Sequence, residues 1–198
     1  MLRLEHQFEC DAKGITYFAL TYPFSYSDCQ KYLDNYEKIY SDHSQIYFHR
    51  ELLGTTLEGR RLDLLTITGR NAETEEREEY IPELFPDSRC RPLKFKKPTI
   101  FVIARVHPGE TQGSHMVNGL LSYLLGKYFI IFSHRGEKNQ RAKEQRVISN
   151  QVLSKFVFKI IPMMNPDGVY KGFFRLDTLG QNLNRYYNNP SLVHSLYT

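Results

Sequence analysis

Two compact apolar segments, each ending at a loop rich in proline and glycine, constrain the fold of this chain more than any other feature. Residues 99–106 and 156–161 are short apolar runs of the kind that form buried strands. Between them, residues 112–125 repeat apolar side chains at helical spacing. Two strands that bracket a helix are typical of a βαβ unit, so we expect an α/β protein with a partly parallel sheet.

The loops that follow these two strands carry polar residues that could bind a metal ion or take part in catalysis. His107 and Glu110 are separated by Pro108 and Gly109, a pair that favours a tight turn. A histidine nitrogen and a carboxylate oxygen brought to one point would supply two of the three protein ligands of a catalytic zinc site. Alternatively, the histidine packs at the strand end and the glutamate stabilises a helix N-terminus. Because ligands bind at the carboxyl ends of strands in open α/β sheets, we expect this loop to lie beside residues 163–168.

The second loop contains the turn sequence of residues 165–168, which Arg175, Asn184 and Arg185 follow. A guanidinium is a planar fork that matches a carboxylate. Arg185 is therefore a candidate to hold a terminal carboxylate, with Asn184 adding a hydrogen bond, and Arg175 is a candidate to polarise a carbonyl. A surface ion pair remains the alternative for either arginine taken singly.

The rest of the chain predicts further strands and helices. Residues 14–22 are β-branched and aromatic, which indicates a strand. A helix is expected from Ser25 or Ser27 to about residue 40, because either serine can cap it. The other expected elements are strands at 45–53 and 61–68, a solvated acidic run at 73–79, an irregular connection at 82–98 and a helix near 147–153.

Composition and charge exclude several classes of protein. With 41% hydrophobic and 24% charged residues among 198, the chain has the composition of a folded domain rather than of a disordered one. Apolar stretches fall short of a membrane span, and charges interrupt the first eleven residues, so we expect a cytosolic protein without a secretory signal. Three cysteines without a CxxC pair fit reduced thiols. The net charge of +4 favours an acidic partner, and no nucleic-acid-binding motif accompanies it.

Taken together, the motifs resemble those of the zinc metallocarboxypeptidase family in identity, order and spacing, and within that family they look like the cytosolic carboxypeptidase branch. The resemblance covers nearly the whole chain, and residues 133–146 match least. It implies α/β/α layers around a mixed, mostly parallel sheet that is incomplete here. Residues 21–198 would be the N-terminal part of the catalytic domain, and residues 1–20 the end of a preceding small β domain. The matching segments are 24–28, 64–68, 105–111, 161–169, Arg175 and 182–186.

The resemblance also implies a site and an activity. His107 and Glu110 would bind Zn2+, Arg175 would face the scissile carbonyl, and Asn184 with Arg185 would bind the terminal carboxylate. The implied reaction removes glutamate, including branch-point glutamate, from polyglutamylated tubulin or other proteins with acidic tails. Such a protein would act in the cytosol, including at microtubules, or in the nucleus.

The sequence departs from the family pattern in two places. The third zinc ligand, a histidine, and the general-base glutamate have no matching motif within these residues. By position, His194 is the best remaining candidate ligand, and the five histidines His6, His43, His49, His115 and His134 are poorer ones. We therefore expect the chain alone to be inactive or nearly so. Because the expected sheet is incomplete, we also expect it to have an unprotected edge strand.

Asn182 stands where many family members have an aspartate that orients the first zinc histidine, so we expect weaker zinc binding than aspartate would give. The alternative to an enzyme is a non-catalytic module that uses Arg175 and Arg185 to bind acidic tails.

Overall fold

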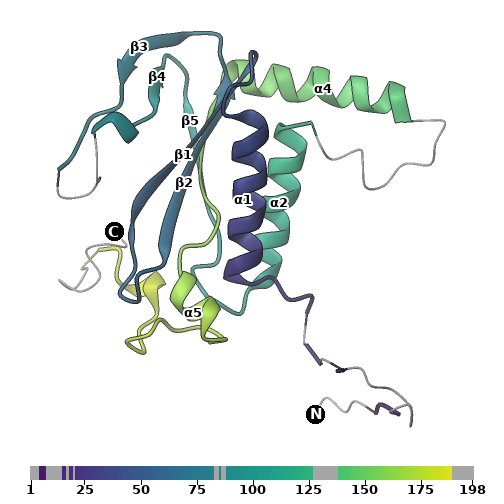
Figure 1. The fold of residues 1–198 in the computed structure, drawn as a ribbon, viewed down its shortest axis with the longest axis vertical. Helices are drawn as coiled ribbons and strands as arrows, with labels where there is room; N and C mark the ends of the chain where they lie inside the picture. The colour runs from purple at the N-terminus through teal and green to yellow at the C-terminus, as the bar shows by residue number, and fades with distance from the viewer. Residues whose placement is uncertain are drawn as a thin grey trace.

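The computed structural model describes residues 5–7, 15–16, 18–19, 21–82, 85, 88–126 and 138–188, and of residues 138–143 and 145 it describes the backbone alone. The long elements are arranged as a sheet with helices packed beside it (Figure 1). In chain order the elements are α1 (Tyr26–Tyr40), β1 (Ile46–Thr55), β2 (Arg61–Gly69), β3 (Glu73–Arg77), the 3-10 helix η1 (Ser88–Cys90), β4 (Leu93–Phe95), β5 (Thr99–Ile103), α2 (Thr111–Leu124), α4 (Lys138–Lys155), β6 (Val157–Ile161), α5 (Pro166–Tyr170) and the 3-10 helix η2 (Leu183–Arg185).

The main sheet is four-stranded, in the order β1-β2-β6-β5. β1 and β2 form an antiparallel hairpin, β2 is antiparallel to β6, and β5 runs parallel to β6 in register from Thr99 opposite Val157 to Ile103 opposite Ile161. The expected mixed α/β sheet is confirmed, and the parallel β5–β6 pair with α2 between its strands is the expected βαβ unit. The described part is less parallel than expected, because the β1–β2 hairpin contributes two antiparallel pairings.

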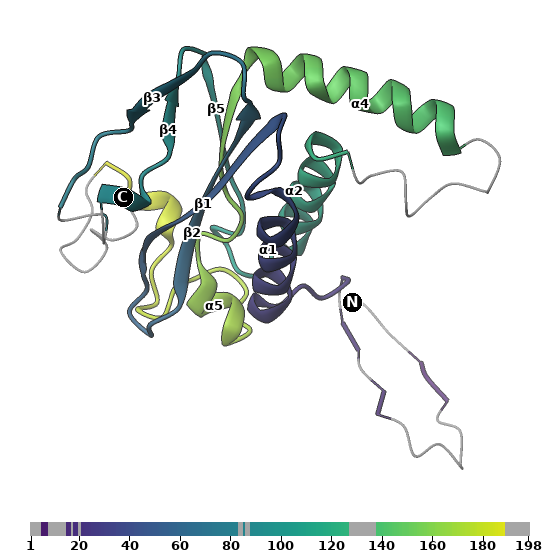
Figure 2. The same cartoon turned by 45° about the horizontal axis from the view of Figure 1, so that its top comes forward.

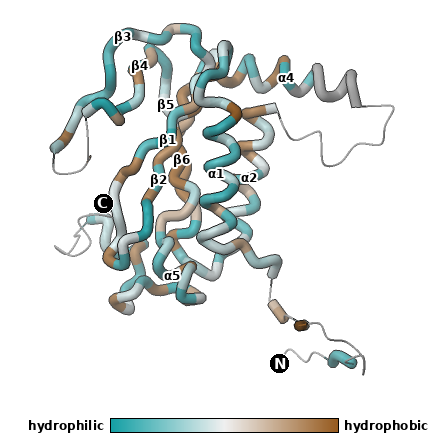
Figure 3. The backbone as a smooth tube through the Cα atoms, viewed as in Figure 1, coloured by the Kyte–Doolittle hydropathy of each residue, from teal (hydrophilic) through white to brown (hydrophobic). Residues whose placement is uncertain are grey.

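The core lies between the sheet and its helices. α1 and α2 lie side by side against one face of the sheet, and α4 crosses near their ends (Figure 2). The hydrophobic colour concentrates along β6 (Figure 3), whose five residues are all buried. The least exposed apolar side chains come from α1, β2, α2, α4 and β6, and they include Leu33, Leu65, Ile67, Leu121, Leu124, Leu153 and Ile160. The strands that carry the two loops therefore pack against the helices through this core.

The beginning of α1 is set by a capping box. The Ser25 hydroxyl accepts a hydrogen bond from the Asp28 backbone N–H at 3.1 Å, and the Asp28 carboxylate accepts one from the Ser25 backbone N–H at 3.1 Å. These reciprocal bonds satisfy two N–H groups that a helix end leaves unpaired. The helix predicted from Ser25 or Ser27 thus begins with Ser25 as its cap.

Three sequence expectations are corrected. The segment 99–106 is a strand only over β5, and β5 is the edge of the sheet rather than its buried centre, with Phe101 57% exposed. The described positions among residues 14–22 are not in a strand, and their apolar side chains are exposed to solvent rather than packed in the core, with Tyr22 85% exposed. The acidic run and the irregular connection contain the two-stranded sheet β3–β4.

No described helix combines the length and the apolar character that crossing a bilayer would require. The predicted division of the chain at residue 20 stays a prediction.

Candidate metal centre at the strand ends

The loops that follow β5 and β6 are joined directly by backbone hydrogen bonds. Ala104 N–H donates to the Ile161 carbonyl at 3.0 Å and its own carbonyl accepts from Met164 N–H at 2.8 Å. Asn165 N–H then donates to the Arg105 carbonyl at 3.1 Å. These bonds continue the parallel pairing beyond the strands, so the two predicted loops lie side by side as expected.

His107 and Glu110 face each other across the bend between β5 and α2. His107 Nδ1 lies 2.8 Å from Glu110 Oε1. The His107 side chain is 7% exposed, whereas that of Glu110 is 47% exposed. The bend therefore points a buried ring nitrogen and a solvent-facing carboxylate at one another, which is the convergence that the spacing predicts.

The other nitrogen of the His107 ring is held by Asn182, which immediately precedes η2. His107 Nε2 lies 3.0 Å from Asn182 Oδ1, and that oxygen also accepts Asn184 N–H at 3.2 Å. Because the Asn182 oxygen is identified by the backbone donor, it accepts the Nε2 proton of the ring. The Asn184 amide nitrogen lies farther away, at 3.4 Å from the same Nε2. With Nε2 as the donor to Asn182, a neutral His107 ring has its unprotonated nitrogen at Nδ1.

This tautomer leaves an unprotonated Nδ1 facing the carboxylate oxygen of Glu110. In a neutral ring both facing atoms are hydrogen-bond acceptors, and two acceptors at 2.8 Å repel each other unless a positive charge, from a proton or a metal ion, lies between them. A divalent cation supplies that charge, and imidazole nitrogen with carboxylate oxygen is a donor set that zinc accepts. The residues present therefore fit one side of a zinc site.

Two glycines allow the loops to approach so closely. A Cβ on Gly109 would lie 2.7 Å from the Phe174 carbonyl oxygen, and one on Gly168 would lie 2.4 Å from Pro108 Cγ. Real Cβ atoms do not approach other atoms so closely, so larger residues would push the loops apart. Both glycines are thus required by packing and not by backbone angles.

Asp167 fastens the β1–β2 hairpin to the start of α5. Its buried carboxylate accepts from the Thr56 hydroxyl at 2.6 Å, from Glu58 N–H at 3.2 Å and from the Arg60 guanidinium at 2.8 Å. Asn165 caps the same helix by accepting Gly168 N–H at 3.0 Å. The turn sequence of residues 165–168 does more than reverse the chain, because it also anchors a hairpin whose tip lies more than 100 residues earlier.

The three residues expected to bind a substrate lie on the exposed side of these loops. Arg175 is exposed and follows Phe174, whose carbonyl accepts Gly109 N–H at 2.7 Å, so its backbone adjoins the bend. Asn184 and Arg185 are exposed in η2, and the Arg185 guanidinium donates to the Asn184 carbonyl at 3.2 Å. Arg175 also lines an open pocket, together with Phe173, Phe174, Leu176, Asp177, Thr178 and Gly180.

Other described histidines have partners elsewhere. His43 Nδ1 accepts two backbone N–H groups, His49 Nε2 lies 2.7 Å from the Cys90 carbonyl, and His115 Nε2 lies 3.3 Å from the Tyr22 carbonyl. His6 packs its ring on Phe18. His134 and His194, two further candidates, lie outside the described residues. Within the described ranges, no three histidine, cysteine or acidic side chains form a group that could hold a metal ion.

Arg105 is a site residue to which the sequence motifs assign no role. Its guanidinium is buried beneath the bend and donates to the Pro108 carbonyl. Burial lowers the pKa of this guanidinium below its usual value. A charged residue inside an otherwise apolar strand sequence was the signal that could have identified it.

Comparison with known proteins gives concordant matches along the chain. The family model described as zinc carboxypeptidase matches residues 29–191. Human cytosolic carboxypeptidase-like protein 5 is 42% identical over 98% of this chain and 21% of its own length, and human cytosolic carboxypeptidase 6 is 34% identical over 90% of this chain and 28% of its own. The chain thus spans about a fifth of the length of the curated relatives it matches first. A metallo-carboxypeptidase structure from Burkholderia cenocepacia aligns with a TM-score of 0.61 and 26% identity, covering 88% of this chain and 36% of that one.

Proposed function

This chain belongs to the zinc carboxypeptidase family, and from that premise we propose that it forms the His107–Glu110 side of a zinc-dependent carboxypeptidase site that removes glutamate from polyglutamylated proteins such as tubulin. The family resemblance predicted from the motifs is confirmed, as is the fold class. The observation that carries the proposal is the 2.8 Å approach of His107 Nδ1 to Glu110 Oε1, with the other ring nitrogen of His107 held by Asn182.

Each residue of the site has a role in this proposal. His107 and Glu110 hold the metal, which when bound would polarise the scissile carbonyl and activate water. Asn184 and Arg185 bind the terminal carboxylate, since a guanidinium fork matches its two oxygens. Arg175 donates to the carbonyl oxygen of the bond that is cut, where negative charge develops.

The proposed substrate class rests on charge and on the resemblance of the motifs. Arg175 and Arg185 are both exposed beside the bend, and the chain carries a net charge of +4, so an anionic tail is attracted to this side of the molecule. We propose polyglutamylated tubulin or another protein with an acidic tail as the partner, branch-point glutamate among the residues removed, and the cytosol as the location.

We also propose that these 198 residues alone have little activity. In the family pattern, a further histidine ligand and a general-base glutamate lie in motifs for which the chain has no match. Two protein ligands hold zinc much more weakly than three, and an activated water needs a base to accept its proton. Release of glutamate from a polyglutamylated peptide by the pure chain would contradict this part of the proposal.

Zinc titration tests the metal site directly. Calorimetry on the 198-residue chain is expected to give one weak zinc site that His107→Ala abolishes and His115→Ala leaves unchanged. Equal zinc binding by the chain and by His107→Ala would rule out the site. In any longer protein that contains this chain, the same substitution is expected to abolish glutamate release.

The second candidate function is a module that binds acidic tails without cutting them. The exposure of Arg175 and Arg185 favours it, because recognition needs only the two guanidiniums. Binding of a polyglutamylated peptide that persists in excess chelator and in His107→Ala, together with no zinc uptake, would support the module. Binding that depends on zinc would support the enzyme.

A further inference from the structure

Arg105 has a backbone conformation that disfavours the residue found there. Its φ is +57°, in the left-handed region, where a side chain with a Cβ crowds its own backbone. Glycine would adopt this conformation without strain. We therefore expect the side chain of this arginine to make contacts that offset the backbone strain.

The Arg105 side chain connects three separate segments from a buried position, being 5% exposed. Nε and Nη2 both donate to the Pro108 carbonyl, at 2.9 and 2.5 Å. Nη1 donates to the Phe24 carbonyl at 3.0 Å and to the Ser114 hydroxyl at 3.0 Å. The guanidinium thus joins the bend to the residue before the cap of α1 and to the first turn of α2.

The peptide unit between Pro108 and Gly109 is held at both ends. Its carbonyl accepts two bonds from Arg105, and its N–H donates to the Phe174 carbonyl at 2.7 Å. Hydrogen bonds from a charged donor are roughly twice as strong as neutral ones, so the carbonyl end is held firmly. This peptide unit lies between His107 and Glu110, so its orientation sets the positions of their Cα atoms, from which the two side chains extend.

We infer that Arg105 is a positioning residue, which fixes the Pro108 carbonyl and thereby directs His107 Nδ1 and Glu110 Oε1 at one point. The inference rests on the proposed function only for the identity of the ion bound there. The fixing of the bend itself is independent of zinc and is measurable without it.

Arg105→Gly distinguishes the contribution of the Arg105 side chain from that of the backbone conformation. Glycine accepts the positive φ, so a purely conformational role predicts a bend at least as stable as in the wild type. If the guanidinium fixes the bend, the Gly109 amide of Arg105→Gly exchanges with deuterium about 10-fold faster or more, while amides of β2 exchange at the wild-type rate. The 15N signals of the His107 ring are expected to change from a single tautomer to an average of two.

Two further variants keep the test decisive. Arg105→Lys keeps the charge but loses the two-pronged contact with Pro108, so the Gly109 amide is expected to exchange at an intermediate rate. If Arg105→Gly fails to fold, the exchange rate of Gly109 in Arg105→Lys alone tests whether the guanidinium fixes the bend. Ser114→Ala is the matched control, since it removes another Arg105 contact and leaves the Pro108 contact in place, and wild-type exchange at Gly109 is expected. Unchanged Gly109 exchange in Arg105→Lys and in any folded Arg105→Gly would overturn the inference.

Zinc titration of the same proteins distinguishes this inference from the proposed function. Arg105→Gly is expected to bind zinc about 10-fold more weakly than the wild type, as happens when groups that orient metal ligands are lost. If Arg105→Gly loosens the bend but no protein binds zinc, the positioning role stands and the zinc proposal fails. If the wild type binds zinc and Arg105→Gly binds it equally with an unchanged bend, the positioning role fails and the zinc proposal stands.

Discussion

His107 and Asn182, 75 residues apart in the chain, are joined by a 3.0 Å contact between Nε2 and Oδ1. The Asn182 oxygen is itself fixed by Asn184 N–H. One amide side chain therefore decides which nitrogen of the histidine faces the carboxylate of Glu110. A neutral amide can select this tautomer, but it adds no negative charge behind the ring.

Asn182→Asp is expected to strengthen zinc binding about 10-fold, because a carboxylate behind the ring makes Nδ1 a stronger donor to the metal while keeping the tautomer. Zinc competition with a chromogenic chelator measures the change. Asn188→Asp is the control, since it adds the same charge to an exposed position after η2. Equal affinities for the wild type and Asn182→Asp would contradict the proposed role of this side chain.

Gly168→Ala is expected to destabilise the fold by about 1–3 kcal/mol, because the added Cβ would lie 2.4 Å from Pro108 Cγ and force the two loops apart. Urea unfolding measures the free energy of unfolding. Zinc binding should weaken in parallel, since Pro108 lies inside the bend.

Gly119→Ala is the matched control for this substitution. Gly119 lies within α2, and apart from its chain neighbours and the backbone of its own helix no described atom lies within 4 Å of the position where its Cβ would be. Alanine favours the helix over glycine, so this variant is expected to be about 0.5–1 kcal/mol more stable than the wild type. A loss of stability equal to that of Gly168→Ala would show that crowding at Pro108 is not the cause.

Local signals in the sequence predicted much of the fold. The serine that caps α1, the apolar spacing of α2 and the two strands β1 and β2 depend on neighbouring residues, and all are found close to their predicted bounds. Position within the sheet depends on distant partners. The apolar sequence of β5 therefore indicated a strand correctly and its burial wrongly.

The candidate site was predictable only in part, for the same reason. The spacing of His107 and Glu110 indicated their convergence, because only a short bend separates them. The contacts of Arg105 with Phe24 and of Asp167 with Thr56 join segments that are far apart in the sequence, so no local sequence pattern predicts them. The roles of Arg175, Asn184 and Arg185 stay predictions.

His49 is expected to make stability depend on pH. Burial lowers its pKa below 6.5, and the nearby cations Arg77, Lys159 and Arg91 lower it further, against the contact with the Cys90 carbonyl. The unfolded chain then takes up a proton at His49 before the folded protein does. The free energy of unfolding should therefore fall as the pH drops through about 6.5 and stop falling below the folded-state pKa.

His49→Gln tests this dependence, because glutamine can still donate to the Cys90 carbonyl but does not titrate. Urea unfolding at pH 8, 7, 6 and 5 is expected to give a shallower fall for His49→Gln than for the wild type. Parallel curves for the two proteins would exclude His49 as a source of the pH dependence.

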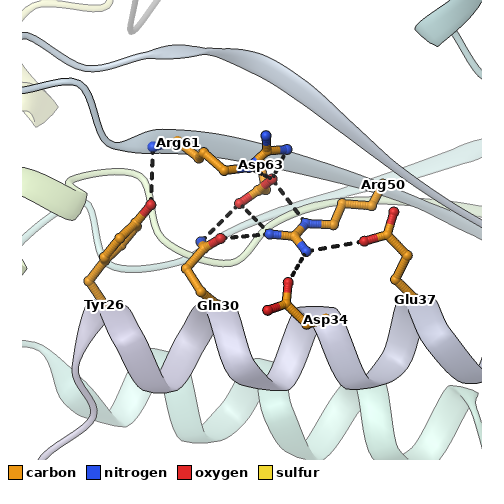
Figure 4. Close-up of polar contacts among 7 residues, drawn as sticks. All are labelled: Tyr26, Gln30, Asp34, Glu37, Arg50, Arg61 and Asp63. Carbon is orange, nitrogen blue, oxygen red and sulfur yellow. Dashed lines mark hydrogen bonds and ion pairs between the residues drawn. The ribbon is translucent and has the colours of Figure 1, made fainter.

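Arg50 on β1 ties the sheet to α1 through a network of polar side chains (Figure 4). Its guanidinium contacts Asp63 at 3.0 Å, Asp34 at 2.6 Å, Glu37 at 3.2 Å and the Gln30 oxygen at 2.6 Å. Burial alone would lower the pKa of Arg50, but the hydrogen bond and charge of Asp63 raise it above its usual value. The guanidinium therefore remains charged inside the interface.

Arg50→Met is expected to destabilise the fold by about 1.5–3 kcal/mol, because it removes one of the two cations that contact the Asp63 carboxylate. That carboxylate is 3% exposed and keeps the contacts of Gln30 and Arg61. Asp34→Asn removes a charge from the same network at a side chain that is 67% exposed, and it should cost less than about 1 kcal/mol. Urea unfolding of both variants measures the difference. Similar small losses in the two would show that the network contributes no more than a surface ion pair. Restoration of stability in Arg50→Met by Asp63→Leu would identify the buried Asp63 carboxylate as the cause.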